Sequence, residues 1–396
     1  MAHPSLKYDL RGVSASKDEV HQAIKHLDKG LYPNAFCKVI QIVVAQDPDY
    51  CNIMHVDTAL APRLALRYIY WRETGDLSVW KGIVEDAIVM NLDDMACVGA
   101  FDHIVLSSTI GRNKSLINAD VISTIINYTQ EFLDKLSIYG IGITLAGGET
   151  ADVGDIVRTI DVGYTAFARM KRADVIDINI KAGDYIVGFS SYGQCVYEDA
   201  YNGGMGSNGL TSSRHDVLSK YYAEKYPESF NPNIPNDVVY TGSKRLTDKI
   251  QIDNQTIDVG KLILSPTRTY MPLIKPMIEQ FRPFIHGLIH CSGGGQTKVS
   301  KFMPSDVAII KDQPFDIAPL FQLIQEESGL SLREMYQVFN MGHRLEAYTT
   351  DEAVAQSMIE LARSFGIEAK IIGRVEKSDR PKIIITTPTE TIDYLY

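Results

Sequence analysis

The part of the chain richest in chemical groups is residues 146–155, which read Ala-Gly-Gly-Glu-Thr-Ala-Asp-Val-Gly-Asp. A short apolar run at residues 141–145 precedes them and is typical of a buried strand. The glycine pair lets the backbone approach a ligand closely, and three carboxylates follow within seven residues. A glycine turn combined with carboxylates on separate elements is suited to holding a hard cation against a phosphate. A nucleotide-using enzyme is therefore the leading hypothesis.

A second acidic signal is the carboxylate of Asp94. Ile83, Ala87, Met90 and Asp94 recur at the spacing of one stripe of a helix, which we expect over residues 77–99. A carboxylate on an apolar stripe is costly to bury unless it meets a cation or hydrogen-bond donors, so Asp94 is a candidate metal ligand, directly or through water. The alternative is a carboxylate at the edge of the core that caps a neighbouring loop.

Asp57 stands at the end of an expected strand, where loops often carry function, but it could equally cap the next helix, with Pro62 near its first turn. Glu149 and Asp152 could belong to an ordinary glycine turn. Together, carboxylates from three loops, Asp57, Asp94 and Glu149, would suit Mg²⁺, which prefers oxygen ligands and usually keeps waters and substrate phosphates.

Two glycine-rich loops mark the second half of the chain. Residues 202–209 read Asn-Gly-Gly-Met-Gly-Ser-Asn-Gly ahead of a helix expected from Ser213, so their backbone N–H groups could bind a phosphate. The alternative is a flexible surface loop. Residues 290–295 read His-Cys-Ser-Gly-Gly-Gly after an expected strand. His290 could act as an acid–base group or serve only the structure.

The order of expected elements fits an α/β layered protein with two domains, at residues 1–170 and 171–396. In the first half we expect strands at residues 37–45, 51–56, 103–108, 141–145 and 157–170 and helices at 63–73, 77–99 and 119–136. In the second half we expect strands at 186–189, 285–290, 369–375 and 382–386, helices from Ser213, from Thr267 and at 351–365, and a polar insertion at 226–260.

The formal net charge of −10 argues against non-specific binding to nucleic acid or to an anionic membrane. Neither a membrane-spanning apolar segment nor a secretory signal is expected. The five cysteines are odd in number and lack zinc spacing, so we expect reduced, mostly buried thiols and a cytoplasmic location.

Seven short motifs in order resemble the aminoimidazole ribonucleotide synthetase family, also called phosphoribosylformylglycinamidine cyclo-ligases. The resemblance runs from about residue 8 to residue 375 and rests on residues 11–14, 91–100, 147–152, 206–209, 265–270, 290–295 and 334–342. It implies two α/β domains and a homodimer whose N-terminal sheets meet in a central barrel. It also implies a small-molecule ribonucleotide substrate, ATP and Mg²⁺, and the ring closure that forms the imidazole in purine biosynthesis.

The resemblance also implies roles for individual residues. Asp57, Asp94 and Glu149 would hold Mg²⁺ and the ATP phosphates, in a pocket shaped by Gly147, Gly148 and Thr150. The ribose phosphate of the substrate would be held by Ser207, Asn208 and Gly209, helped by Gly293, Gly294 and Gly295. His290 would be the nearest proton carrier and, with Asp94, the catalytic pair.

The chain departs from the family at residues 57–62, which read Asp-Thr-Ala-Leu-Ala-Pro where the family usually has Asp-Gly-x-Gly-Thr-Lys. The missing lysine is a point charge for phosphate, and whether Arg63 or Lys81 replaces it stays open. Met205-Gly206 stands where the family often has Pro-His, and Asp93-Asp94 where it has Asn-Asp.

Asp57-Thr58 with Leu60 looks more like thiamine-monophosphate kinase, of the same superfamily. Two alternatives therefore remain beside the cyclo-ligase. One is a diverged member that uses ATP on another substrate, and the other is a catalytically silent dimer that binds nucleotide or a partner.

Overall fold

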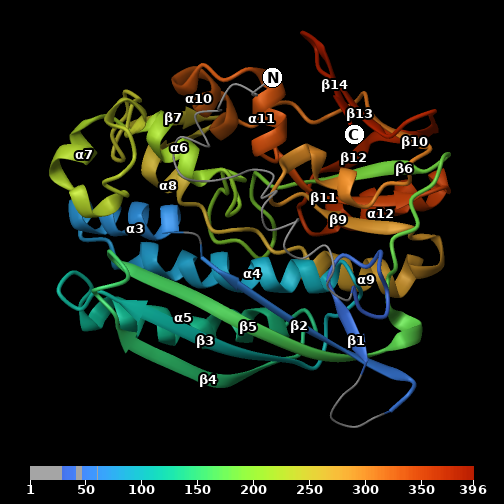
Figure 1. Ribbon diagram of the computed structural model, residues 1–396, viewed down its shortest axis with the longest axis horizontal. Helices are drawn as coiled ribbons and strands as arrows, with labels where there is room; N and C mark the ends of the chain where they lie inside the picture. The colour runs from blue at the N-terminus through green and yellow to red at the C-terminus, as the bar shows by residue number, and fades with distance from the viewer. Residues whose placement is uncertain (1–28, 42–46, 60) are drawn as a thin grey trace.

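The computed structural model describes residues 29–41, 47–59 and 61–396 (Figure 1). The motif at residues 11–14 and part of the strand expected at 37–45 lie outside these ranges. The first half of the chain forms a five-stranded sheet with the order β1-β2-β5-β3-β4. Its elements are β1 (Val39–Gln41), β2 (Tyr50–Thr58), α3 (Ala61–Thr74), α4 (Lys81–Ala96), β3 (Ile104–Arg112), α5 (Ala119–Ser137), β4 (Ile143–Asp152) and β5 (Ile160–Lys171).

The second half forms a seven-stranded sheet with the order β14-β13-β10-β12-β6-β11-β9, and a separate two-stranded hairpin, β7-β8. The strands are β6 (Tyr185–Ser190), β7 (Lys249–Ile252), β8 (Gln255–Asp258), β9 (Gly287–His290), β10 (Val307–Lys311), β11 (His343–Thr349), β12 (Ala369–Lys377), β13 (Lys382–Thr386) and β14 (Thr391–Leu395). The helices are α6 (Leu210–Val217), α7 (Tyr221–Lys225), α8 (Val259–Ile263), α9 (Met271–Phe281), α10 (Pro319–Ser328), α11 (Leu332–Val338) and α12 (Glu352–Ser364).

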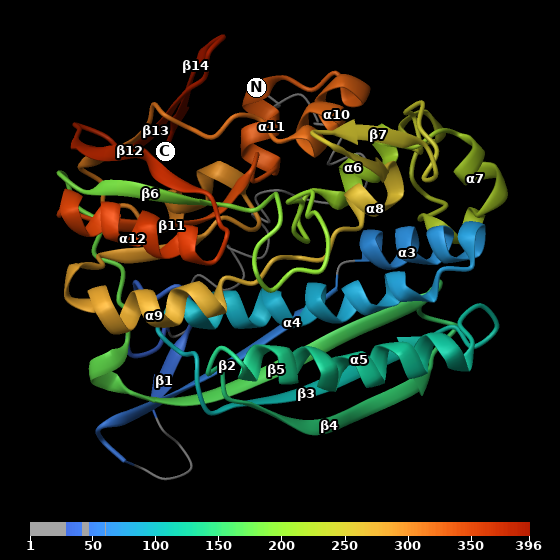
Figure 2. The ribbon, with the colours of Figure 1, turned by 180° about the vertical axis from the view of Figure 1, so that it is seen from behind.

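The two halves meet along α4, which lies between the five-stranded sheet and the second half of the chain (Figures 1 and 2). One side of α4 packs on β2 and β5, and its flanks contact α5 and α9. Nearly every α4 residue is buried, because both of its sides are covered. A helix buried on both sides can carry polar side chains only where they find partners, and α4 has such partners in the second half of the chain.

The opposite face of the five-stranded sheet is not covered by any described helix (Figures 1 and 2). Met54 and Val56 on β2 and Val105 on β3 point to this face and are 64%, 66% and 40% exposed. Phe167 on β5 lies directly opposite both Met54 and Val105, so the four side chains form one apolar surface. We call these four residues the open apolar face.

Most of the strands and helices expected from the sequence are present, but several of their boundaries were wrong. The helix expected at 77–99 divides into a 3₁₀ turn (Leu77–Trp80) and α4. The helices expected from Ser213 and Thr267 begin at Leu210 and Met271 instead. The polar insertion at 226–260 contains the β7-β8 hairpin, and β10, α10, α11, β11 and β14 were not foreseen.

The glycine turn expected after a strand at 141–145 is also wrong, because β4 continues through it to Asp152. The register between β3 and β4 shifts between Leu106 and Ser108, which leaves one extra residue on β4. Gly147 has φ of +93°, so it absorbs this bulge in a conformation that favours glycine. Pairing with β3 therefore overrides the local turn tendency of the glycine pair.

Two further expectations concern the whole chain. The five cysteines are all buried and none forms a disulfide. In the described part of the chain, no helix combines the length and apolar character needed to cross a membrane.

Candidate active site

The centre of the candidate site is Asp94, near the C-terminal end of α4. Its Oδ1 lies 2.6 Å from Nδ1 of His290, at the end of β9, and its Oδ2 lies 3.4 Å from Nε2 of His55 on β2. Burial would raise the pKa of Asp94, but the hydrogen bonds from His290 and His55 more than offset it and hold the pKa well below its usual range. Asp94 is therefore an anion that joins the two halves of the chain.

His55 was missed from sequence, although strand alternation puts it on the same face of β2 as Asp57. Its Nδ1 lies 2.9 Å from Oδ1 of Asn91, whose amide nitrogen donates to two backbone carbonyls, so Nδ1 is the donor. Burial lowers the pKa of His55, but its hydrogen bond to Asp94 and the charges of Asp94 and Asp57 raise it above the ordinary value overall. Asp94 thus contacts this imidazole, and Asp57 lies two residues further along the same face of β2.

Within a single chain, Glu149 lies apart from Asp57 and Asp94. Asp57 pairs with Tyr164, Tyr164 with Ser108, and Ser108 with Gly148, so these four residues form one row across the sheet. Three strand spacings separate the ends of the row by about 14 Å. Because Glu149 follows Gly148, it points to the opposite, uncovered face. Glu149 is exposed, as are its neighbours Gly147, Gly148 and Thr150.

The described residues contain no group of three or more His, Cys, Asp or Glu side chains arranged around a metal position. A single chain therefore does not assemble Asp57, Asp94 and Glu149. Mg²⁺ usually needs only one or two protein carboxylates beside phosphate and water oxygens, and each carboxylate oxygen of Asp94 has a second lone pair. Asp94 thus keeps free acceptor capacity for a metal–phosphate complex, Asp57 lies on the same side of the sheet, and Glu149 points to the opposite face.

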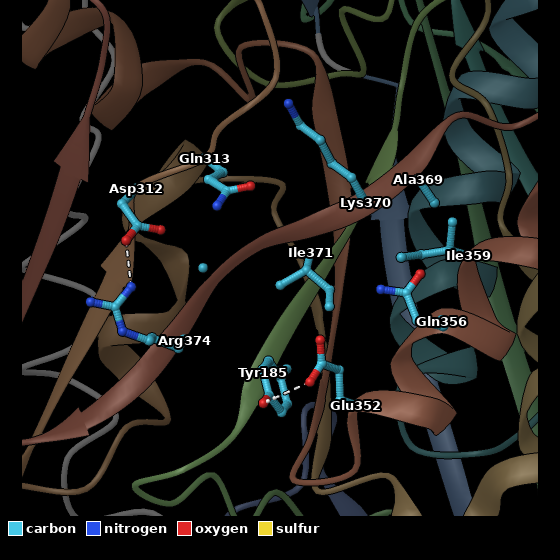
Figure 3. Close-up of a pocket in the computed structure, with 11 residues that line it drawn as sticks. Tyr185, Asp312, Gln313, Glu352, Gln356, Ile359, Ala369, Lys370, Ile371 and Arg374 are labelled. Atoms are coloured by element: carbon cyan, nitrogen blue, oxygen red, sulfur yellow. Dashed lines mark hydrogen bonds and ion pairs between the residues drawn. The ribbon is translucent and has the colours of Figure 1, made fainter.

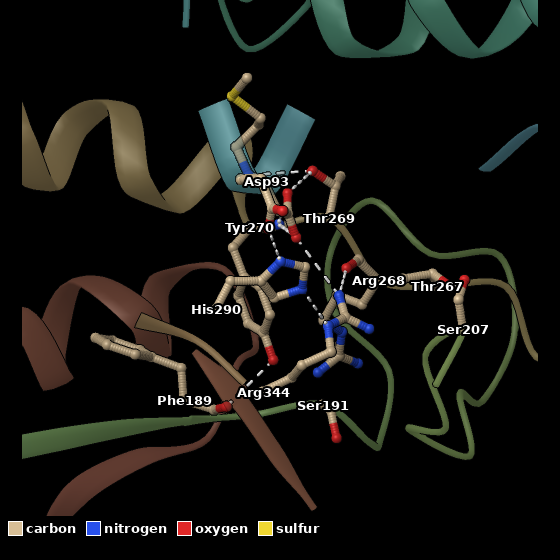
Figure 4. Close-up of polar contacts among 12 residues, drawn as sticks. Asp93, Phe189, Ser191, Ser207, Thr267, Arg268, Thr269, Tyr270, His290 and Arg344 are labelled. Carbon is tan, nitrogen blue, oxygen red and sulfur yellow. Dashed lines mark hydrogen bonds and ion pairs between the residues drawn. The ribbon is translucent and has the colours of Figure 1, made fainter. Parts of the chain in front are cut away.

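His290 is fully buried, and protein groups occupy both of its ring nitrogens (Figure 4). Nε of Arg344, on β11, lies 3.1 Å from His290 Nε2. Because an arginine nitrogen can only donate, Nε2 accepts this hydrogen bond and Nδ1–H donates to Asp94. A role for His290 as a proton carrier stays a prediction, and it requires the contact with Arg344 to open.

Asp93, the neighbour of Asp94, holds the segment that enters α9. Its Oδ1 accepts hydrogen bonds from Oγ1 of Thr269 at 2.8 Å and from the backbone N–H of Tyr270 at 3.0 Å. Its Oδ2 lies 3.5 Å from Nη2 of Arg344. Burial raises the pKa of Asp93, and its neighbours His290 and Arg344 offset only part of that effect.

Asp86 lies two helical turns earlier on α4 and holds the same segment at Thr267, whose N–H and Oγ1 donate to Asp86 Oδ1 at 2.9 and 2.8 Å. Arg63 and Arg67 of α3 form fully buried ion pairs with this carboxylate. Burial would raise the pKa of Asp86, but the two guanidinium charges more than offset it, so its pKa is lowered.

These contacts also show whether Arg63 or Lys81 takes the place of the lysine that is missing from residues 57–62. The Arg63 guanidinium is enclosed by Asp86 and donates to the carbonyls of Ser265 and Gly206. Lys81 forms an ion pair with Glu131 on the protein surface, at 3.1 Å. Neither side chain faces Asp57 and Asp94, so neither replaces the lysine.

The two glycine loops of the second half come together. A Cβ added to Gly293 would lie 3.3 Å from Oδ1 of Asn208, so the loops at 207–209 and 293–295 are in contact. Gly209 has φ of +82° and caps α6, and a Cβ there would collide with the ring of Phe339. These close contacts require glycine and give the pair of loops a defined shape.

A small cavity separates these loops from the Asp94 network, and Arg344 lies between the two (Figure 4). The cavity is lined by Met205, Gly206, Ser207, Asn208, Cys291, Ser292, Val338, Asn340 and Arg344. The predicted substrate residues Ser207, Asn208 and Gly293 therefore lie beside the His290–Arg344 pair. Gly294 and Gly295 continue from this loop into a 3₁₀ turn.

A groove of about 510 Å³ lies away from this site, between β12 and α12 (Figure 3). Its charged side chains and Tyr185 already have partners: Tyr185 donates to Glu352 at 3.2 Å, Lys370 donates to the carbonyl of Pro314 at 2.9 Å, and Arg374 pairs with Asp312. The groove therefore offers no uncompensated charge to a ligand.

Comparison with known families agrees with this geometry. Residues 37–170 match the model of the AIR synthase related protein N-terminal domain, and residues 239–386 match the corresponding C-terminal domain. The protein is a two-domain α/β protein of this class. The chain belongs to the AIR synthase related family.

Among curated relatives, the phosphoribosylformylglycinamidine cyclo-ligase of Methanococcus vannielii is 28% identical over 296 residues, which cover 74% of this chain and 70% of that protein. The enzyme of the same name from Methanocaldococcus jannaschii is 28% identical over 302 residues, covering 74% and 71%. These are the proteins that the chain resembles in sequence.

Among solved structures, Thermotoga maritima PurL complexed with FGAR has a TM-score of 0.55 at 13% identity. The match covers 96% of this chain but only 50% of PurL, so the chain spans half the length of that protein. HypE in the HypE–HypF complex has a TM-score of 0.55 at 14% identity and is covered over 99% of its length. At these identities the likeness establishes the fold alone.

Proposed function

We propose that the protein is an ATP-dependent ligase that closes formylglycinamidine ribonucleotide to aminoimidazole ribonucleotide. The observation that carries the proposal is the adjacency of two sets of groups. Asp94, with Asp57 on the same side of the first sheet, suits a magnesium–phosphate complex, and the paired loops at 207–209 and 293–295 suit a ribonucleotide. The names of the cyclo-ligase relatives support the same reaction.

In the proposed reaction, the amide oxygen of the substrate attacks the γ-phosphorus of ATP and ADP leaves. An amine nitrogen of the same substrate then attacks the activated carbon, the phosphate leaves with the former amide oxygen, and the nitrogen loses a proton. Phosphorylation turns a poor leaving group into a good one, so the protein has mainly to position the groups and stabilise phosphate charge. Bound Mg²⁺ would supply part of that charge, held by Asp57 and Asp94.

The proposal includes a homodimer, supported by the open apolar face and by the exposed edge strand β4. A second copy packed on this face would cover Met54 and Val56 and would place its own groups near the exposed Glu149. Glu149 would then take part in the ATP site only in the assembled dimer.

A second candidate is a family member that uses ATP on another substrate. One observation favours it: the lysine of the family's glycine loop is missing, and the structure offers neither Arg63 nor Lys81 in its place. Loss of that charge weakens phosphate binding but does not exclude it. A third candidate, a silent nucleotide-binding dimer, is consistent with the same departure.

One assay separates the three candidates. Purified protein is incubated with ATP, magnesium and formylglycinamidine ribonucleotide, and aminoimidazole ribonucleotide and ADP are both measured. Stoichiometric formation of the two products supports the cyclo-ligase. ADP without ring closure supports the second candidate, and nucleotide binding without ADP formation supports the third.

A further inference from the structure

Lys298 is a half-buried cation in the 3₁₀ turn (Gly295–Lys301) that continues from the triple glycine. The turn packs against β9 and α11. A Cβ added to Gly294 would lie 3.7 Å from the Cα of Lys298, so the backbone of this lysine lies against the glycine loop. The position of the Cα is therefore fixed by the fold, while the long side chain extends from it.

The Lys298 side chain reaches toward the first half of the chain. Its Nζ lies 5.4 Å from the centre of the Phe36 ring. The next residue, Cys37, has a buried thiol whose pKa is raised by burial and by the carboxylate of Asp94 and lowered by the ammonium of Lys298. Because such effects come from charges close to the group, Asp94 and Lys298 both lie near the Cys37 thiol. The ammonium therefore lies close to the Asp94 network, at the junction of the two halves.

The Lys298 ammonium has no counter-charge in the part of the chain that the structure describes. Neither an ion pair nor a hydrogen bond joins its Nζ to a described residue, and the ring of Phe36 is its partner. A cation–π contact at a partly exposed site is weak, and burial disfavours a charge that lacks an opposite charge. The flexible four-carbon stem can thus turn the ammonium from this ring toward an anion without moving the backbone.

Two other cations beside the Asp94 network are already paired. Arg344 lies 3.5 Å from the carboxylate of Asp93, and Arg268 forms an ion pair with Glu198 at 2.5 Å. The two candidates named for the missing lysine are paired as well. Lys298 thus differs from these four side chains in having its charge available.

Transfer of a phosphoryl group needs positive charge around its oxygens, and a protein can supply that charge from a metal ion, an arginine or a lysine. In the proposed reaction, Asp57 and Asp94 would hold the metal ion from the first half of the chain. Lys298 belongs to the second half and follows the loop at 293–295 that is proposed to hold the substrate. It would therefore approach ATP from the substrate side, where the terminal phosphate must lie for transfer.

We propose that Lys298 Nζ binds the γ-phosphate of ATP and supplies, from the second half of the chain, the positive charge that residues 57–62 lack. The assignment rests on the proposed function for the use of ATP, and it deepens that function by naming the cation. The ammonium makes and breaks no covalent bond. It stabilises charge on the oxygens of the phosphoryl group while the amide oxygen attacks and ADP leaves.

The first experiment compares two nucleotides by calorimetry on the full chain with magnesium: AMP-PNP, an ATP analogue whose γ-phosphate is not transferred, and ADP. Lys298→Met keeps most of the length of the side chain and removes its charge. It should weaken AMP-PNP binding at least tenfold, because a charge-assisted contact is lost, and ADP binding less than threefold. The control Lys377→Met, at an exposed position on β12, should change the affinity for either nucleotide less than twofold.

Unchanged AMP-PNP affinity in the Lys298→Met protein, shown by circular dichroism to be folded, would overturn the assignment. Equal losses for AMP-PNP and ADP would overturn it too, since the contact would then not be with the γ-phosphate. Failure of the unaltered protein to bind AMP-PNP would have the same consequence.

Two further substitutions separate charge from packing. Lys298→Arg keeps the charge and should bind AMP-PNP within threefold of the unaltered protein, whereas Lys298→Glu should bind it more weakly than Lys298→Met, because like charges repel. Equal effects of all three substitutions would mean that the length and packing of the side chain matter and its charge does not.

Binding of ribose 5-phosphate distinguishes the phosphate of ATP from that of the substrate. Lys298→Met should change the affinity for ribose 5-phosphate less than twofold, and a larger loss there than with AMP-PNP would place Lys298 at the substrate instead. The outcome for AMP-PNP does not depend on ring closure. Selective loss of AMP-PNP binding, together with no aminoimidazole ribonucleotide from the unaltered protein, would therefore count against the proposed function and not against Lys298.

Discussion

Asp94 Oδ1 lies 2.6 Å from Nδ1 of His290, although 196 positions separate the two residues. This contact joins α4 in the first half of the chain to the end of β9 in the second. Because Asp94 on α4 also faces His55 on β2, its carboxylate connects this helix to one strand in each of the two large sheets. The contacts that fix the relative position of the two halves are therefore the same contacts that form the candidate site.

The first prediction concerns this carboxylate. Asp94→Asn keeps the shape of the side chain but removes the charge that would face a magnesium ion. We expect magnesium-dependent ATP binding, measured by calorimetry, to weaken by at least tenfold, since Mg²⁺ strongly prefers anionic oxygens. Asp102→Asn, a change at an exposed carboxylate beside His103, is the control and should leave ATP binding unchanged. If the two variants bind ATP equally well, Asp94 is not part of the metal site.

The second prediction concerns the buried pairing of Asp86 with Arg63 and Arg67. Asp86→Asn leaves two buried guanidinium groups without a counter-charge, which typically destabilises a protein by about 3–5 kcal/mol. Urea denaturation should show this loss in the free energy of unfolding. Asp312→Asn breaks a surface pair with Arg374 and should cost less than about 1 kcal/mol. Similar losses in both variants would show that the buried pair adds nothing special.

How much of the site could be foreseen is clear from its individual residues. Helical spacing put Asp94 on the buried side of α4, and the strand before the triple glycine located His290. Their contact could not be derived, because it depends on how the two sheets pack across α4. His55 was accessible from strand alternation with Asp57, but a lone histidine in an apolar strand is ambiguous without its partner.

Glu149 and Arg344 illustrate two further limits. The glycine pair before Glu149 predicts a turn from local propensity, whereas long-range pairing with β3 keeps the segment extended and turns Glu149 to the open face. Arg344 lies in a strand, β11, that was not foreseen, and its neighbours His343 and Glu346 are polar too, so the residue did not stand out in the sequence. Both depend on contacts between distant segments, which residue spacing alone does not encode.

The third prediction concerns Glu85 on α4, which accepts a hydrogen bond from the hydroxyl of Tyr128 at 2.8 Å. Burial raises the pKa of Glu85 to about 7, and the bond from Tyr128 offsets only part of this effect. Because the folded state holds the proton more tightly than the unfolded chain, this residue's contribution to stability falls as the pH rises from about 4.5 to 7. Glu85→Gln should therefore remove a loss of roughly 3 kcal/mol.

Urea denaturation at pH 5 and pH 8 measures this effect. At pH 8 the Glu85→Gln protein should be more stable than the unaltered protein, and at pH 5 the difference should be several times smaller. Glu131→Gln on the neighbouring helix α5 is the control, because Glu131 is exposed and pairs with Lys81 at the surface. A constant difference at both pH values would mean that Glu85 does not titrate in this range.

The last prediction concerns the open apolar face. Met54 and Val56 are 64% and 66% exposed on a single chain, and large apolar groups clustered in this way commonly mark an interface. Val56→Asp puts a charge on this face, two residues along β2 from Met54. Burying that charge between two copies would be costly, so the dimer should dissociate at least tenfold more readily in analytical ultracentrifugation. Val196→Asp, at a 60% exposed position in the second half of the chain, should leave the association unchanged.

If the dimer requires Glu149 at the ATP site, the monomeric Val56→Asp protein should also lose ATP binding at concentrations where it remains folded. A stable dimer in the Val56→Asp protein would place the interface elsewhere, and ATP binding by a monomer would show that one chain suffices.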